Sequence, residues 1–189
     1  MTPSPPFRPL SNPPRSLFEL AERFGLTEVD DGEPRTDVSL YGVTLSTDDV
    51  KECDLFVGLA GQKHHGARFA EAARASGAVA VLTDEAGVDA ARSSGLPIVV
   101  ADDPRSVLGA VSAWVYGTDV HRPTMYGVTG TTGKTSTVYL IEAILRQMGV
   151  LVGLSSTAER HIGSEAQVSA LTTPEATELH GLLGRAVEE

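Results

Sequence analysis

The sequence predicts an α/β protein with a mainly parallel sheet, and two observations support this prediction. First, short stretches of continuous apolar residues alternate along the 189-residue chain with segments of helical periodicity. Strands that are apolar on both faces are typical of parallel sheets covered by helices on both sides. Second, glycines and polar turn residues separate these segments at short intervals. We therefore expect one or two domains built from alternating strands and helices.

Helices are expected where apolar residues recur every three to four positions and a cap or a glycine marks the end. The segments that meet this description are residues 16–26, 67–77, 87–95, 105–117, 134–149 and 175–189. Asp103 and Pro104 are a typical N-cap and first helical residue for the fourth segment. Thr173, which precedes Pro174, is expected to cap the last one.

Strands are expected where apolar and β-branched residues run together between turn residues. These segments are 38–45, 54–61, 78–84, 96–102, 124–130 and 150–156. The proline-rich residues 1–14 show no periodicity, and we expect a disordered leader there. A polar break at 118–123, which ends in a proline, indicates a boundary between a first domain over 15–120 and the start of a second domain over 121–189.

The composition is ordinary for a globular protein, but the charge is acidic. Hydrophobic residues make up 41% of the chain, and the net charge is −10. This charge argues against a nucleic-acid partner, because polyanion binders usually carry a basic patch. The single cysteine, Cys53, excludes an intrachain disulfide. The chain has no secretory h-region and no apolar run near the roughly 20 residues that span a bilayer. We therefore expect a cytoplasmic protein that does not insert into the membrane. We also expect it to be a monomer.

Residues 127–136, GVTGTTGKTS, have the strand–loop–helix setting of a phosphate-binding loop. Glycines let several backbone N–H groups point at phosphate oxygens, and the start of the following helix adds partial positive charge. We expect ATP here, with Lys134 as the catalytic cation for its β- and γ-phosphates and the Thr135 hydroxyl as a ligand of Mg²⁺. The expected ATP-binding residues are Gly130, Thr131, Thr132, Gly133, Lys134, Thr135 and Ser136.

The loop departs from the general phosphate-loop pattern, which has glycine where this chain has Val128. Its frame, T-G-T-T-G-K-T, resembles the ATP loop of the Mur ligase family, the amide-bond-forming ligases of peptidoglycan synthesis. The usual family form is T-G-T-N-G-K-T, so Thr132 stands at the asparagine position. Residues 42–84 resemble the uridine-binding N-terminal domain of the member that adds the third residue of the stem peptide. Residues 170–183, ALTTPEATELHGLL, resemble the TTPE segment of the same member.

This resemblance implies a set of substrate-binding residues. Leu45 and Thr47 would contact the uracil and ribose, whereas Asp48 occupies a position that is arginine in the family. The loop containing Gln62, Lys63 and His64 would close over the uridine diphosphate of the substrate. Further along the chain, Thr172 and Thr173 would bind the muramoyl-peptide part. The two partners expected from the resemblance are therefore UDP-N-acetylmuramoyl-L-Ala-D-Glu and an amino acid.

The resemblance implies an ATP-dependent ligase that works through an acyl phosphate and adds diaminopimelate or lysine. The family also uses a later glutamate, a carbamylated lysine, a histidine and a third domain, and the sequence ends before these. We therefore expect the uridine-binding domain, the truncated start of the ATPase domain, and no turnover by this chain alone.

Two alternatives remain open at this point. One is a protein that binds the UDP-muramoyl-peptide and ATP without catalysis. The other is an unrelated P-loop kinase, although the acidic residues after the loop are all glutamates and a kinase would need further Mg²⁺-binding and base residues. Folylpolyglutamate synthetases share the loop type but lack a uridine-binding domain at the front, so residues 42–84 argue against them.

Overall fold

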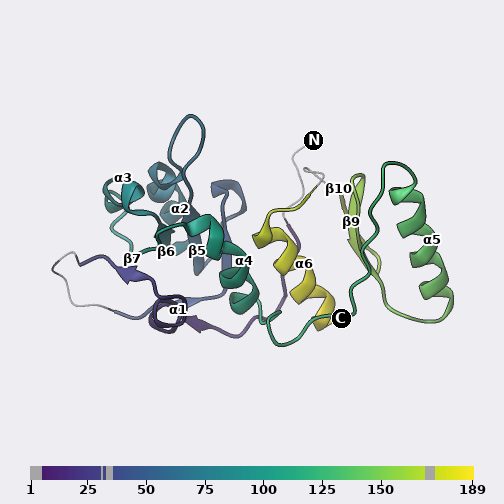
Figure 1. The fold of residues 1–189 in the computed structure, drawn as a ribbon. Coiled ribbons are helices and arrows are strands. Elements are labelled where there is room, and N and C mark those ends of the chain that lie inside the picture. Colours follow the sequence, from purple (N-terminus) through teal and green to yellow (C-terminus); the bar gives the residue numbers. More distant parts are fainter. Residues whose placement is uncertain (1–5, 31, 33–35, 169–172) are drawn as a thin grey trace.

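Five strands form the main sheet, in the order β2-β7-β6-β5-β4. A computed structural model describes residues 6–30, 32, 36–168 and 173–189 (Figure 1). The strands of this sheet are β2 (Thr27–Glu28), β4 (Gly42–Thr44), β5 (Asp54–Gly58), β6 (Ala78–Thr83) and β7 (Ile98–Val100). The pairs β4–β5, β5–β6 and β6–β7 are parallel, and β2 joins the edge of β7 in the antiparallel direction. The predicted, mainly parallel sheet is confirmed.

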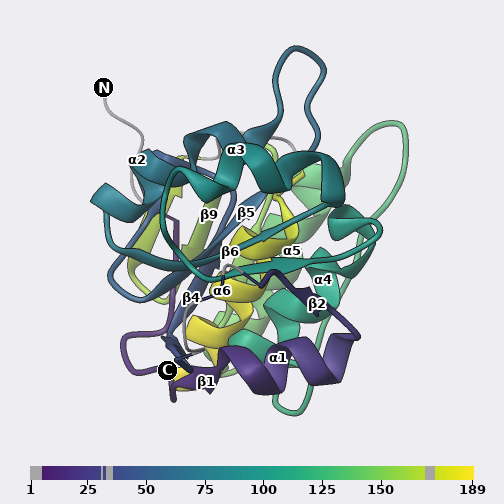
Figure 2. The same ribbon diagram turned by 90° about the vertical axis from the view of Figure 1, so that its left-hand side faces the viewer.

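Helices cover both faces of this sheet (Figures 1 and 2). One face carries α1 (Leu17–Phe24) and α4 (Pro104–Val115), and the other carries α2 (Ala70–Ala75) and α3 (Val88–Arg92). Three short 3₁₀ turns occur in the connections: η1 (Thr47–Asp49) follows β4, η2 (Gly66–Phe69) precedes α2, and η3 (Glu85–Gly87) precedes α3. A separate two-stranded sheet is formed by β1 (Arg15–Ser16) and β3 (Ser39–Leu40).

The strands alternate their side chains between the two helical layers. In β5, Leu55 and Val57 belong to the core under α1 and α4, whereas Phe56 belongs to the core under α2 and α3. All five residues of β5 are buried. A strand buried on both faces has no polar side, which explains why continuous apolar runs correctly predicted this sheet.

The last third of the chain forms a second group of elements. It contains α5 (Lys134–Gln147), the antiparallel strands β8 (Gly153–Ser155), β9 (Glu159–Ile162) and β10 (Glu165–Val168), and α6 (Ala176–Glu188). Helix α6 lies between the main domain and the β8–β10 sheet and packs against α4 (Figure 1). His180 of α6 places Nδ1 2.6 Å from Thr118 Oγ1, and burial lowers the pKa of this histidine.

Two local predictions in this region are wrong, and one element was missed. Residues 124–130 form no strand and are mostly exposed, because no neighbouring strand pairs with them in the described part of the chain. Helix α6 starts after Glu175 without a side-chain cap, so Thr173 lies too early in the chain to be its N-cap. The β9–β10 hairpin was not expected, although the two residues Gly163-Ser164 between its strands are a hairpin signal, and Gly163 has φ +55°.

The predicted disordered leader is also wrong for residues 6–14, the part of it that the structure describes. We call residues 6–12 the N-terminal strap. Arg8 Nη1 donates to both carboxylate oxygens of Asp54, at 2.7 and 2.6 Å, and Nη2 donates to the Asp49 carbonyl at 2.9 Å. The Asn12 side chain donates to the Tyr41 and Val115 carbonyls. These contacts connect the strap to β5 and α4.

The strap also lies against α6. Phe7 is buried with Leu182 and Ile162, and the backbone N–H groups of Leu10 and Ser11 donate to the Glu188 carboxylate at 2.7 Å. Gly181 of α6 makes this approach possible, because a Cβ there would lie 2.4 Å from the Phe7 carbonyl oxygen. Local periodicity cannot predict such contacts, because they join residues that are far apart in the sequence.

No helix in the described ranges combines the length and the apolar character needed to cross a membrane.

The buried Arg8–Asp54 pair predicts that the strap contributes strongly to stability. The side chains of Arg8 and Asp54 are only 7% and 1% exposed. Arg8→Met leaves an uncompensated carboxylate in the interior, so we expect a loss of about 3–5 kcal/mol in the free energy of unfolding, measured with urea. Arg23→Gln removes an exposed pair with Asp119 and should cost less than about 1 kcal/mol. If Arg8→Met unfolds like Arg23→Gln, the strap is not docked as described.

Candidate functional site

A cleft of about 320 Å³ opens beyond the carboxyl ends of β4 and β5. Its floor is made by the ends of these strands and the residues that follow them, 43–46, 57 and 59–61. The strap residues 6–8 form one wall, and Arg105 of α4 with the start of α6 forms another. Ligands of open α/β sheets usually bind at the carboxyl ends of parallel strands, so this cleft is the expected place for a substrate.

The segment after β4 is held by a short turn. The Thr44 hydroxyl accepts from the Ser46 N–H and donates to the Ser46 carbonyl, both at 3.2 Å. The Ser46 hydroxyl in turn accepts from the Asp48 N–H and caps η1. This turn places Leu45 and Ser46 on the cleft, whereas Thr47 lies in η1 and is not among the lining residues. Of the neighbouring hydroxyl residues Ser46 and Thr47, the one that lines the cleft is therefore Ser46.

The loop after β5 has a fixed base and an exposed tip. His65 Nδ1 accepts from the Ala67 N–H at 3.1 Å, and Nε2 lies 2.9 Å from Asp84 Oδ1. Because Nδ1 accepts, this pattern assigns the proton of the neutral ring to Nε2. The Gly66 N–H donates to the Leu59 carbonyl at 2.7 Å and closes the loop.

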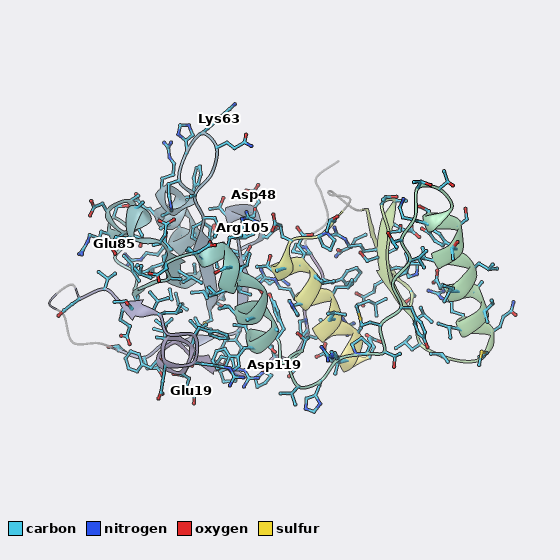
Figure 3. All side chains as sticks on the ribbon, viewed as in Figure 1. Glu19, Asp48, Lys63, Glu85, Arg105 and Asp119 are labelled. Carbon is cyan, nitrogen blue, oxygen red and sulfur yellow. The ribbon has the colours of Figure 1, made fainter. Side chains whose placement is uncertain are left out.

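Gln62, Lys63 and His64 form the tip of this loop, and all three are exposed. Lys63 points outward there (Figure 3). The cleft is lined by Gly61 and Gly66 on either side of the tip, but not by the tip residues themselves.

The charged groups at the cleft have different environments. Burial raises the pKa of Asp54 and of Asp49, and Arg8 opposes both shifts. Arg8 is buried in its pair with Asp54, whereas the Arg105 side chain is 61% exposed. Arg105 lies 3.4 Å from Glu175 Oε2, and Glu178 pairs with Arg160 at 2.5 Å. Sequence reasoning missed these residues; the only signal for Arg105 was its place after a strand and the Asp103-Pro104 cap.

The phosphate loop leads into α5, and its residues 129–136 are exposed. Gly130 and Gly133 have φ of +151° and +81°, conformations that side chains rarely adopt. Helix α5 begins at Lys134 and has no side-chain cap at its N-terminus. Lys134 Nζ donates to the Gly130 carbonyl at 2.6 Å. The loop is therefore curled around its own lysine, at an uncapped helix start that can bind an anion.

A Mg²⁺ ion fits this loop only as a partner of the nucleotide. Among the described residues no group of three His, Cys, Asp or Glu side chains could hold a metal ion. Thr135 is exposed in the first turn of α5. Mg²⁺ commonly keeps several waters and is held by substrate phosphates with one or two protein oxygens, so a single hydroxyl is a suitable contribution.

The predicted threonines of the TTPE segment are less well placed. Thr172 lies outside the described residues, and Thr173 is exposed and does not line the cleft. Glu175, two residues further on, does line it. In Figure 1, helices α5 and α6 both run downward from their first residues, so the phosphate loop and the segment before α6 precede the upper ends of these two helices.

A parallel sheet with a cleft at its carboxyl edge, followed by a glycine-rich loop at a helix start, is an arrangement typical of α/β proteins that bind nucleotides. Residues 39–126 match the domain described as the Mur ligase family, catalytic domain, and residues 128–189 match the Mur ligase middle domain. The chain therefore belongs to the Mur ligase family, and the predicted resemblance is confirmed.

Named relatives are consistent with this family. A UDP-N-acetylmuramyl-tripeptide synthetase of Leifsonia xyli subsp. xyli is 52% identical over 175 residues, which cover 93% of this chain and 34% of that protein. A UDP-N-acetylmuramoyl-L-alanyl-D-glutamate–2,6-diaminopimelate ligase of Streptomyces avermitilis is 43% identical over 180 residues, covering 95% and 34%. A solved structure of a ligase with the latter name is 25% identical with a TM-score of 0.59, covering 85% and 32%. The chain spans about a third of the length of these relatives.

The close packing at the base of the loop after β5 predicts that position 58 must be glycine. A Cβ on Gly58 would lie 2.6 Å from both the Cα and the backbone nitrogen of Ala67. We expect Gly58→Ala to lower the free energy of unfolding by about 1–3 kcal/mol through overpacking. Gly109→Ala is the matched control, because a Cβ there meets nothing within 4 Å in α4, and it should stabilise by about 0.5–1 kcal/mol. Equal effects of both changes in urea unfolding would contradict this packing.

Proposed function

We propose that this chain forms the substrate-binding and nucleotide-binding part of an ATP-dependent ligase that adds the third stem-peptide residue to UDP-N-acetylmuramoyl-L-Ala-D-Glu. The observation that carries the proposal is that the cleft and the phosphate loop both lie within the segment shared with a tripeptide synthetase. Membership in the Mur ligase family excludes the unrelated P-loop kinase.

The uridine diphosphate part of the substrate would occupy the cleft. In this proposal Leu45 contacts the uracil from the floor of the cleft, and Thr47 contributes from η1 just beyond it. Gln62, Lys63 and His64 then close over the diphosphate. Their position supports this role, because the tip is exposed while the His65–Asp84 contact holds the base of the loop. Thr172 and Thr173 would bind the muramoyl peptide near the start of α6.

ATP would bind the loop from Gly130 to Ser136. The phosphates would take the place of the Gly130 carbonyl as the partner of Lys134, and the loop N–H groups would donate to their oxygens. Thr135 and the phosphates would hold Mg²⁺, which neutralises charge on the transferred group when bound. This assignment makes Lys134 the catalytic residue of the chain, because it is the only lysine in the loop and touches the reacting phosphates.

The reaction we propose has two steps. A carboxylate oxygen of the substrate attacks the γ-phosphorus of ATP, and ADP leaves with the electrons of the broken P–O bond. The amine of the incoming amino acid then attacks the acyl carbon, phosphate leaves, and the nitrogen loses a proton. Catalysis of phosphoryl transfer depends mainly on positioning and charge neutralisation, and the phosphate loop supplies both for the nucleotide.

The nucleotide site predicts that Lys134→Ala weakens ATP binding. Removing the one full charge of the loop should raise the dissociation constant of ATP with Mg²⁺ by about tenfold or more, since hydrogen bonds between charged groups contribute about 1.5–3 kcal/mol. Lys51→Ala is the control, because Lys51 is also exposed but precedes β5. Isothermal titration calorimetry on the 189-residue chain measures the dissociation constant of ATP for both variants. Equal ATP affinity of the two variants would contradict the assigned loop.

The activity itself can be tested in a longer protein. In a chimera, this chain replaces the matching third of the Leifsonia xyli relative, with which it is 52% identical. We expect ADP release that depends on UDP-N-acetylmuramoyl-L-Ala-D-Glu and on either meso-diaminopimelate or L-lysine. Lys134→Ala should lower that rate by about 100-fold or more, whereas Lys51→Ala should not. A chimera that binds the UDP substrate and ATP without releasing ADP would favour the non-catalytic binding protein instead.

A further inference from the structure

Two arginines line the cleft, and only one of them is available to a ligand. Arg8 uses Nη1 for both oxygens of Asp54 and Nη2 for the Asp49 carbonyl, and its side chain is 7% exposed. Arg105 is 61% exposed and makes a single ion pair within the described ranges, with Glu175. The cation that a ligand entering the cleft can recruit is therefore Arg105.

The Arg105–Glu175 pair is loose. Nη1 and Oε2 are 3.4 Å apart, longer than the roughly 2.7–2.9 Å of a strong charge-assisted hydrogen bond. The Glu175 side chain is itself 37% exposed. Exposed pairs of this kind contribute little to stability and exchange readily for a better partner. A diphosphate is such a partner, because a guanidinium can donate to two of its oxygens at once.

The backbone of Arg105 is fixed while its side chain is free. Asp103 caps α4 by accepting from the Arg105 N–H at 3.0 Å, and Pro104 is buried at the first helical position. Arg105 therefore starts from a rigid helix end on the wall of the cleft (Figure 3). Glu175 lies after the polar segment 118–123 that was predicted as a domain boundary, and it immediately precedes α6.

Lys63 is in a different position. It lies at the exposed tip of the loop after β5, away from Arg105 in Figure 3, and does not line the cleft. A diphosphate bound within the cleft would meet Arg105 directly, whereas Lys63 would first have to fold inward with its loop.

We propose that Arg105 binds the diphosphate of the UDP substrate inside the cleft, and that Glu175 holds this arginine in the free protein and releases it when the substrate enters. The proposal rests on the function proposed above and adds a binding residue to it. Arg105 selects for the diphosphate, while the floor of the cleft receives the uridine. Because Glu175 immediately precedes α6, the replacement of Glu175 by the diphosphate as the partner of Arg105 would also connect substrate binding to the segment that contains Thr173.

The test compares UDP with uridine on the 189-residue chain, using calorimetry and ligand-detected NMR for the weaker ligand. We expect Arg105→Gln to weaken UDP binding by about tenfold or more and to leave uridine binding within about twofold. Glu175→Gln should tighten UDP binding several-fold, because it removes the competing carboxylate. The matched control is Arg23→Gln, whose pair with Asp119 has the same 3.4 Å distance and a similar exposure of 55%, but whose position in α1 is outside the cleft.

The outcomes separate this inference from the function on which it rests. If the wild-type chain binds UDP and Arg105→Gln binds it as well as Arg23→Gln does, the role of Arg105 is wrong and the substrate assignment stands. A parallel loss of UDP and uridine in Arg105→Gln also overturns the inference, because it would show a structural role. If the wild-type chain binds neither ligand at millimolar concentration, the proposed function fails, and the inference fails with it.

Discussion

The parallel register of β4, β5, β6 and β7 is the constraint on which the rest of this structure depends. Parallel strands place all their carboxyl ends at one edge, and helices on both faces leave that edge as the open place for loops. Leu45, Ser46 and the loop after β5 reach the cleft for this reason. The position of the cleft thus follows from the parallel order of the strands, and the individual loops decide which side chains line it.

Long-range contacts complete the cleft. Its walls come from the strap, from the start of α4 and from the start of α6, three segments that are far apart in the chain. The strap is held by the buried Arg8–Asp54 pair on one side and by Phe7 packed on Leu182 on the other. Burying two charges is costly unless they are paired and further hydrogen-bonded. Here the Lys51 N–H and the Asp49 carbonyl supply those additional bonds.

The phosphate loop, in contrast, is formed by residues that are neighbours in the sequence. Its shape arises locally from Gly130, Gly133 and the start of α5, and its lysine is held by a carbonyl of the same loop. Polar contacts connect helix α5 to the β8–β10 sheet: buried His161 lies 2.5 Å from Glu142, and Arg146 donates to the Gly163 carbonyl. A site made from one continuous segment can be recognised from its residues alone, and for this reason the stretch GVTGTTGKTS was sufficient to predict the loop.

The sequence by itself determined the alternation of strands and helices, the parallel character of the sheet and the glycine-rich loop that precedes α5. Periodicity, caps and glycine spacing act over a few neighbouring residues, so they can be read along the chain. The tertiary structure alone decided that residues 6–12 are docked, with residues 6–8 as a wall of the cleft, and that Arg105 faces Glu175. It also decided that residues 124–130 pair with no strand in the described part of the chain. Those outcomes depend on burial and charge pairing between distant residues, which local patterns do not encode.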